Sequence, residues 1–206
     1  MQELGCLQRQ QSKKEWQNKK VKELTHSVVG VIGLGSIGTA VVQKAAVLGM
    51  EVHALRRRQL GDEQSDVIMH YGDDGLNELL VVSDFVVCTL PLTHSTNGML
   101  GKKQFAMMKP EAVLVNVGRG EVVDDDALVS ALQAGTIRGA VLEVFKVEPL
   151  PMDHIYWSME NVLIAPHCAD NTDDQHSDAL AIYQKNLKNF IGDRPLTCVV
   201  DRNEGY

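Results

Sequence analysis

Three glycines with the spacing Gly-x-Gly-x-x-Gly are the residues in this sequence best suited to bind a ligand. Gly33, Gly35 and Gly38 directly follow the apolar run 28–32 and open a helical pattern. In this context the first glycine allows a tight turn, the second lets a pyrophosphate approach the backbone, and the third allows close helix packing. The start of a helix also favours phosphates. A dinucleotide site is therefore predicted, with a plain turn as the alternative. The expected contacts are Gly33, Gly35, Ser36, Ile37 and Gly38.

A run of arginines stands at the position that decides which dinucleotide is bound. About 20 residues after the glycine motif, an acidic residue would accept hydrogen bonds from the ribose of NAD. The sequence has Arg56, Arg57 and Arg58 there instead. Guanidinium groups cannot accept hydrogen bonds but can clamp a phosphate, so they favour NADP, with NAD still possible. We expect Arg56 and Arg57 to hold the 2′-phosphate; a solvated turn is the alternative, because three adjacent side chains cannot all point at one phosphate.

Three later segments carry polar residues in an ordered series. They read CTLPLTHSTNGML from residue 88, NVGRGEVVDDDALVSALQAGTIRGAVLEVFKVEPLP from residue 116, and NVLIAPHCA from residue 161. With the glycine motif, they resemble the successive signature motifs of the D-isomer-specific 2-hydroxyacid dehydrogenases, over about residues 28–200. The arginine-rich second strand and the ending PHCAD…VVDRNEGY are most similar to the glyoxylate and hydroxypyruvate reductase branch.

The resemblance implies three catalytic residues. The family's arginine falls on Arg119, its carboxylate on Glu148 and its acid–base histidine on His167. Reduction of a 2-keto acid places negative charge on the carbonyl oxygen, which needs a cation and a proton donor. Arg119 would polarise the keto acid, His167 would protonate it, and Glu148 would orient the imidazole. Ordinary loop residues are the alternative for each. Cys168 is not expected to pair with His167, since neighbours in extended chain point to opposite sides.

Further cofactor contacts are implied along the ends of the predicted strands. One position departs from the family pattern, because the aspartate of its leucine-aspartate-valine-phenylalanine motif is here Glu143. The longer side chain keeps an acceptor for the nicotinamide carboxamide but displaces it by about one methylene, which alters the geometry of hydride transfer. The implied contacts outside the glycine motif and the arginines are Leu90, Pro91, Thr96, Asn116, Val117, Gly118, Arg119, Glu143, His167 and Ala169.

Short apolar runs alternating with helical patterns must position these residues. Such alternation is typical of β-α-β units, and runs that are apolar throughout fit strands covered on both faces. The sequence therefore predicts an α/β fold: a doubly wound parallel sheet, or Rossmann fold, with helices on both faces. We expect strands at 28–32, 51–56, 67–71, 84–90, 112–117, 138–143 and 162–165, and helices at 37–48, 75–82, 102–108, 124–134 and 173–191.

Composition argues against several classes of protein. The 206 residues are 44% hydrophobic, too apolar for a disordered chain, and their formal charge of -7 argues against a nucleic-acid partner. The four cysteines form no Cys-x-x-Cys pair, so no metal site is expected and a reduced, cytoplasmic location fits. No signal-type segment or run of about 20 apolar residues occurs, so no membrane association is expected. Other histidines, such as His26, His70 and His94, are read as surface or packing residues.

Three regions are expected along the chain. Residues 1–27 form an arm or helix that is a remnant of a substrate domain, 28–172 form the NAD(P)-binding domain, and 173–206 form a helix and tail that return toward that absent domain. The resemblance also implies a homodimer formed through the cofactor domain. The expected function is NADP-preferring oxidation and reduction of a small 2-hydroxy or 2-keto acid such as glyoxylate or hydroxypyruvate, impaired in this short form. The alternative is a dinucleotide-binding regulatory protein without turnover.

Overall fold

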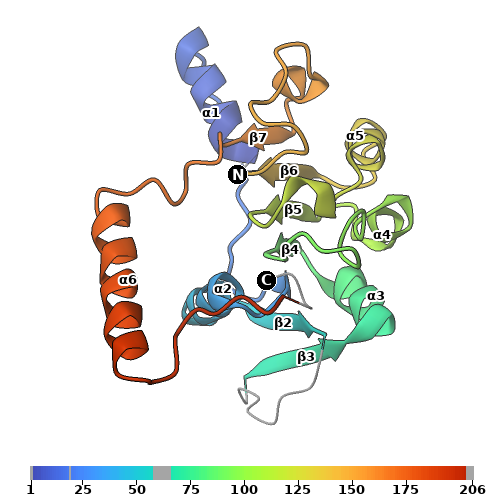
Figure 1. Cartoon of the computed structure of the whole chain (residues 1–206). Coiled ribbons are helices and arrows are strands. Elements are labelled where there is room, and N and C mark those ends of the chain that lie inside the picture. The colour runs from blue at the N-terminus through green and yellow to red at the C-terminus, as the bar shows by residue number, and fades with distance from the viewer. Residues whose placement is uncertain (1, 19, 58–65, 203–206) are drawn as a thin grey trace. The chain divides into compact units, whose positions relative to one another are not determined.

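The computed structural model describes residues 2–18, 20–57 and 66–202 (Figure 1). The chain divides into two compact units, one ending at Pro166 and the other beginning at His167. The first unit contains a seven-stranded sheet with its helices, and the second contains one long helix and a tail. The residues of the glycine motif, Arg56 and Arg57 therefore belong to the first unit.

All paired strands of the sheet are parallel, in the order β3-β2-β1-β4-β5-β6-β7. The order reverses between β1 and β4, which is the switch point of a doubly wound sheet. The predicted Rossmann fold is confirmed. The strands are β1 (Val28–Ile32), β2 (Glu51–Arg56), β3 (Val67–Tyr71), β4 (Phe85–Cys88), β5 (Val113–Asn116), β6 (Gly139–Leu142) and β7 (Val162–Ile164).

Helices of the first unit follow the strands in the alternation that the sequence predicts. The N-terminal segment forms a helix, and two short 3₁₀ turns occur that the sequence patterns do not predict, because three or four residues show no periodicity. The helices are α1 (Gln2–Lys13), α2 (Ser36–Val47), α3 (Gly72–Val82), α4 (Lys102–Met107) and α5 (Asp125–Gln133), and the 3₁₀ turns are η1 (Gly120–Val122) and η2 (Ile155–Ser158).

Two apolar clusters, one on each face of the sheet, form the core. The larger packs Leu79 of α3, Phe105 of α4 and Leu128 of α5 against the central strands. The smaller packs Val42 and Ala45 of α2 against β1 and β2. Full burial of a leucine, valine or phenylalanine side chain stabilises the fold by about 1.5–3 kcal/mol. The second cluster therefore fixes α2 on the sheet, and with it the position of the helix start.

Element ends differ from the predicted bounds by at most three residues. β4 ends at Cys88 and not at residue 90, because the chain turns toward Pro91, which has no N–H to continue the ladder. α3 begins at Gly72, three residues early, and its first turn contains Asp73 and Asp74. Two carboxylates there interact favourably with the positive end of the helix dipole, which supports the longer helix.

His70 is not an isolated surface or packing residue. It is 8% exposed, and its Nε2 lies 2.8 Å from Nδ1 of His53, with the two rings stacked. Nδ1 of His70 lies 3.1 Å from Glu78 Oε2, and Nε2 of His53 lies 2.8 Å from Glu51 Oε1. This chain of hydrogen bonds joins β2, which also carries Arg56, to β3 and α3. The sequence did not show it, because the two histidines meet only through strand pairing.

The second unit contains α6 (Gln175–Ile191) and a tail that folds back beside it. The Asn186 side chain donates from Nδ2 to Thr197 O and accepts from the Thr197 N–H, each over 2.9 Å. Asn189 Nδ2 donates to Pro195 O over 2.9 Å. Across both units, the described residues include no helix that is long and apolar enough to cross a membrane.

Asp84 joins three segments at the amino-terminal edge of the sheet. Its Oδ2 accepts from the Val28 N–H at 2.9 Å, and its Oδ1 accepts from Lys22 Nζ at 2.9 Å and Lys109 Nζ at 3.3 Å. Burial is the largest single influence and raises the pKa of Asp84, but these partners together outweigh it and hold the pKa below its ordinary value. The ionised carboxylate therefore stabilises the start of β1.

We expect Asp84→Asn to destabilise the protein by about 1–2 kcal/mol near neutral pH, because the amide cannot accept the same charge-assisted hydrogen bonds. A lowered folded-state pKa contributes stability above the unfolded-state pKa and loses it as the pH falls through the folded-state value. The difference between wild type and variant in denaturant unfolding should therefore shrink below about pH 4. A difference that stays constant down to acid pH would contradict this role.

Candidate dinucleotide and catalytic site

One row of paired residues crosses the carboxyl-terminal edge of the sheet. Ile32 of β1 pairs with Leu55 of β2 on one side and with Cys88 of β4 on the other. The row continues from Cys88 to Asn116 of β5 and on to Leu142 of β6. Adjacent strands lie about 4.8 Å apart, so the loops that follow these residues start side by side. Most of the predicted site residues lie in those loops.

Backbone hydrogen bonds extend this row one residue beyond the strands. The N–H of Gly33 donates to Leu55 O at 3.1 Å. The N–H groups of Thr89, Val117 and Glu143 donate in the same way over 3.0 Å. Their acceptors are the carbonyl groups of Ile32, Cys88 and Asn116, respectively, on the adjacent strands. The first residue of each loop is thereby held to its neighbour before any side chain is considered. The parallel strand pairing therefore fixes where the loops after β1, β4, β5 and β6 begin relative to one another.

The glycine motif makes the turn from β1 into α2. Gly33 has a φ of +99°, and a Cβ at Gly38 would lie 1.9 Å from Gly33 O, so the helix packs directly on the turn. A Cβ at Gly35 would meet nothing within 4 Å, so the space beside it is open. Ser36 and Ile37 are exposed there. Within α2, no acidic residue lies in the first turn and no side chain caps the start. The geometry suits an anion at this helix start.

Arg56 and Arg57 lie at the same edge of the sheet as the glycine turn. Arg56 is the last residue of β2 and is half-buried, and Arg57 follows it and is exposed. Arg56 comes directly after Leu55, whose carbonyl accepts the Gly33 N–H. The backbone of Arg56 is therefore one residue from the hydrogen bond that holds the glycine turn. Arg58 lies outside the described residues.

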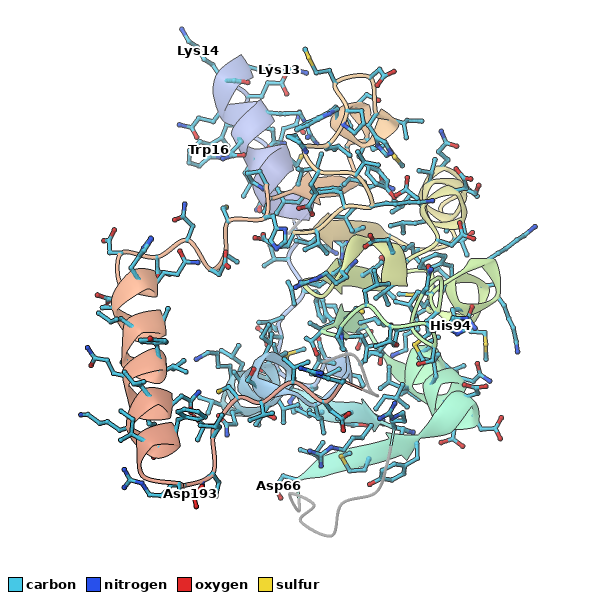
Figure 2. The ribbon with its side chains drawn as sticks, in the orientation of Figure 1. Lys13, Lys14, Trp16, Asp66, His94 and Asp193 are labelled. Carbon is cyan, nitrogen blue, oxygen red and sulfur yellow. The ribbon has the colours of Figure 1, made fainter. Side chains whose placement is uncertain are left out.

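Threonine side chains shape the loop after β4. Thr96 is 9% exposed; its Oγ1 donates to Pro91 O at 2.7 Å and accepts from the Thr93 N–H at 2.8 Å. Leu90 and Pro91 at the start of the loop are half-buried. His94 is exposed on the same loop, as expected for a surface histidine (Figure 2). Thr96 therefore fixes the course of the loop that presents Leu90 and Pro91.

Asn116 holds the loop after β5. It is 1% exposed; its Nδ2 donates to Arg119 O at 3.1 Å, and its Oδ1 accepts from the Gly118 N–H at 3.1 Å. The turn that results presents Arg119 as an exposed side chain, with Nη1 donating to Gly118 O at 2.7 Å. Val117 lies half-buried within it. Because the buried Asn116 amide forms hydrogen bonds through both its Nδ2 and its Oδ1 to the same loop, it restrains the backbone that carries Arg119.

A close backbone approach brings the Arg119 loop against the loop after β6. A Cβ at Gly120 would lie 2.1 Å from the carbonyl carbon of Phe145, so only glycine fits there. The Phe145 N–H donates to Glu148 Oε1 at 2.9 Å, and buried Glu143 begins the same loop. The first unit therefore places the loops of Arg119 and Glu148 next to each other.

His167 is the first residue of the second unit. His167 is exposed and has a φ of +47°. Ala169 is also exposed, but its φ is not positive. A left-handed backbone at a residue other than glycine costs on the order of 1–3 kcal/mol and is common at functional positions. Two residues earlier, the Ala165 N–H donates to Leu142 O at 2.9 Å and ends the row at the sheet edge. Arg119 and Glu148 thus share the first unit, and His167 opens the second.

Thr89 is a residue of this edge that the sequence reasoning missed. Its Oγ1 donates to Gly33 O at 2.8 Å and lies 3.2 Å from Ile32 O. The available signal was its position, a polar residue directly after the last paired residue of β4 at the switch point. No group of three or more histidine, cysteine or acidic side chains suited to a metal ion occurs in the part of the chain that the structure describes.

The sheet order, the glycine turn and the adjoining loops define a dinucleotide-binding domain of the Rossmann type. The model of the NAD-binding domain of the D-isomer specific 2-hydroxyacid dehydrogenases matches residues 1–169. This chain belongs to that family, and the resemblance seen in the motifs is confirmed.

The chain is also similar to curated proteins that are named as glyoxylate/hydroxypyruvate reductases. The chain is 42% identical over 166 residues to glyoxylate/hydroxypyruvate reductase B of Pectobacterium carotovorum subsp. carotovorum, which covers 80% of this chain and 51% of the relative. It is 38% identical over 169 residues to the Yersinia pestis reductase of the same name, covering 82% of this chain and 52% of that one. The chain therefore spans about half the length of the curated relatives it matches.

Solved structures of the family superpose on the whole chain. A D-isomer specific 2-hydroxyacid dehydrogenase from Xanthobacter autotrophicus Py2, in complex with NADPH and MES, gives a TM-score of 0.90 at 33% identity and covers 100% of this chain and 83% of that chain. The NADPH-dependent glyoxylate/hydroxypyruvate reductase from Sinorhizobium meliloti, in complex with NADP and sulfate, gives 0.90 at 29% identity, with 99% and 65% covered.

We expect Gly38→Ala to destabilise the ligand-free protein by more than about 2 kcal/mol, because its Cβ would lie 1.9 Å from the Gly33 carbonyl oxygen. Gly35→Ala is the matched control. Its Cβ meets nothing within 4 Å and its φ of -78° suits alanine, so only the lower N-cap preference of alanine counts and stability should stay within about 1 kcal/mol of wild type. Thermal unfolding checks both, and equal stabilities would show that α2 does not pack on the turn as described.

Proposed function

We propose that this chain binds NADP(H) and, through it, oxidises and reduces a small 2-hydroxy or 2-keto acid of the glyoxylate or hydroxypyruvate class. The observation that carries the proposal is the glycine turn, with open space at Gly35 and an uncapped helix start beside Arg56. Two similar proteins named as glyoxylate/hydroxypyruvate reductases, from Pectobacterium and Sinorhizobium, support the substrate class.

The proposed preference for NADP over NAD rests on the arginines at the end of β2. The chain has a formal charge of -7, so an anionic cofactor needs local cations. Arg56 and Arg57 supply two at the position where an acidic residue would select NAD. Two of the superposed solved structures, from Xanthobacter and Sinorhizobium, hold NADPH or NADP.

Arg56→Asp combined with Arg57→Ala should raise the Kd for NADPH at least tenfold and leave the Kd for NADH within about threefold, since each charge-assisted hydrogen bond is worth about 1.5–3 kcal/mol. Fluorescence titration of both cofactors measures this. Lys103→Ala, which removes an exposed charge from α4, is the control and should change neither constant. Equal losses for NADPH and NADH would mean that the arginines form only a solvated turn.

The proposed chemistry assigns one role to each predicted catalytic residue. The nicotinamide, when bound, exchanges a hydride with the substrate carbon. Arg119, presented by the rigid turn after β5, would bind the acid and stabilise the negative charge that grows on the carbonyl oxygen. The protonated imidazole of His167 would donate a proton from a ring nitrogen to that oxygen, and would take it back in oxidation. Glu148 would orient the imidazole and favour its charged form.

The remaining residues of the site are proposed as the cradle of the cofactor. Glu143 would accept from the nicotinamide carboxamide, and its burial at the start of the loop after β6 supports a fixed acceptor. The residues proposed to line the cofactor along the other loops are Leu90, Pro91, Thr96, Asn116, Val117, Gly118 and Ala169.

His167→Asn should lower NADPH oxidation with glyoxylate or hydroxypyruvate at least a hundredfold, as expected for the loss of a general acid, and should leave the Kd for NADPH within about threefold. His94→Asn, at an exposed loop histidine, is the matched control and should leave both unchanged. Unchanged turnover in His167→Asn would remove this residue from the mechanism. NADPH binding without turnover in wild type would mean that this chain alone does not form a working active site, which is the outcome expected both for an impaired short form of the enzyme and for the alternative, a dinucleotide-binding regulatory protein.

We also propose a homodimer that acts in the cytoplasm. Support for the dimer comes from the family resemblance, and support for the location comes from the widely spaced cysteines, none of which is paired among the described residues. The only small-molecule partners proposed are the cofactor and the acid.

A further inference from the structure

Thr89 connects the end of β4 to the glycine turn. Its backbone N–H donates to Ile32 O at 3.0 Å, which places the residue beside the last residue of β1. Its Oγ1 reaches one residue further and donates to Gly33 O at 2.8 Å; Ile32 O, at 3.2 Å, is the more distant acceptor. A hydroxyl has one hydrogen, so the shorter contact to Gly33 is the main bond.

The Gly33 carbonyl is the contact point between the turn and α2. A Cβ on Gly38 would lie 1.9 Å from Gly33 O and 3.0 Å from Thr89 Oγ1, so these three groups meet at one point. The loop around them is rich in glycine, and glycine restricts its own backbone less than any other residue. Leu34 of the turn packs against the smaller apolar cluster, but the side-chain hydrogen bond to the Gly33 carbonyl is donated by Thr89. The neighbouring strand β4 therefore supplies a polar restraint on the turn in addition to this packing.

We propose that Thr89 is a positioning residue for the dinucleotide: its hydrogen bond to Gly33 O fixes the glycine turn against α2 before the cofactor arrives. The inference rests on the proposed function, because it assumes that the pyrophosphate binds at this turn. Fixing a flexible loop in its binding conformation removes an ordering cost that would otherwise reduce affinity. Thr89 contacts neither the reacting atoms nor the substrate in this role, and acts only through Gly33.

The same strand offers a matched control at its other end. Ser83 precedes β4, is completely buried, and donates from Oγ to Leu79 O at 2.6 Å. Both hydroxyls donate to a backbone carbonyl, but Ser83 bonds within the last turn of α3, and of the two only Thr89 bonds to the glycine turn. Removal of Ser83 Oγ should lower stability without changing the affinity for a dinucleotide.

The test compares Thr89→Val, which keeps the shape and loses the donor, with Thr89→Ser, which keeps the donor. Thr89→Val should raise the Kd for NADPH about tenfold, the equivalent of one hydrogen bond of about 1.4 kcal/mol, and Thr89→Ser should stay within about threefold of wild type. Ser83→Ala should leave the Kd unchanged. Calorimetric titration gives the constants, and thermal unfolding without ligand shows how much stability each variant loses.

A second probe separates loop positioning from general damage. Adenosine 2′-monophosphate has no pyrophosphate, so its affinity, measured by NMR titration, should be the same in Thr89→Val and wild type. Should Thr89→Val not fold, Thr89→Ala removes the same donor and replaces it in every comparison. NADPH affinity equal to wild type in the donor-free variant, or an equal loss for both probes, would overturn the inference. Failure of wild type to bind NADPH would instead overturn the proposed function.

Discussion

Parallel pairing at the carboxyl-terminal edge of the sheet is the constraint on which the rest of this site depends. Ile32, Cys88 and Asn116 stand in one row, and the residue after each donates its N–H to the strand beside it. Because the row fixes where each loop begins, side chains more than eighty residues apart in sequence reach the same place. The order of the strands, which reverses between β1 and β4, opens the site at that point.

Side chains that bond to backbone then convert this edge into a rigid site. Asn116 and Thr96 each use their polar atoms on their own loop, and Thr89 uses its hydroxyl on the turn of a neighbouring strand. A loop held this way does not need to order itself when a ligand binds, so less binding energy is spent on ordering. Arg119, to which the proposed function assigns chemistry, is exposed, and the buried Asn116 and Thr96 hold the loops around the site.

The sequence predicted what is local and missed what depends on contacts between strands. Gly33, Gly35 and Gly38 were recognisable because a strand, a turn and a helix follow one another directly, and the seven strands were recognisable from their apolar runs. The hydrogen bond between Thr89 and Gly33 spans 56 residues, and its partners are set only by the pairing of β1 with β4. The same holds for the histidine pair that joins β2 to β3. Resemblance to a family supplied the catalytic assignments, which periodicity and spacing did not contain.

We propose that the carboxyl-terminal edge of the sheet is a preformed site for a dinucleotide with a 2′-phosphate. Its most direct test is calorimetric titration of the wild-type chain with NADPH and, separately, with NADH. We expect one site per chain, with NADPH bound at least tenfold more tightly than NADH. Absence of NADPH binding up to about 1 mM, equivalent to a binding free energy weaker than about -4 kcal/mol, would contradict it.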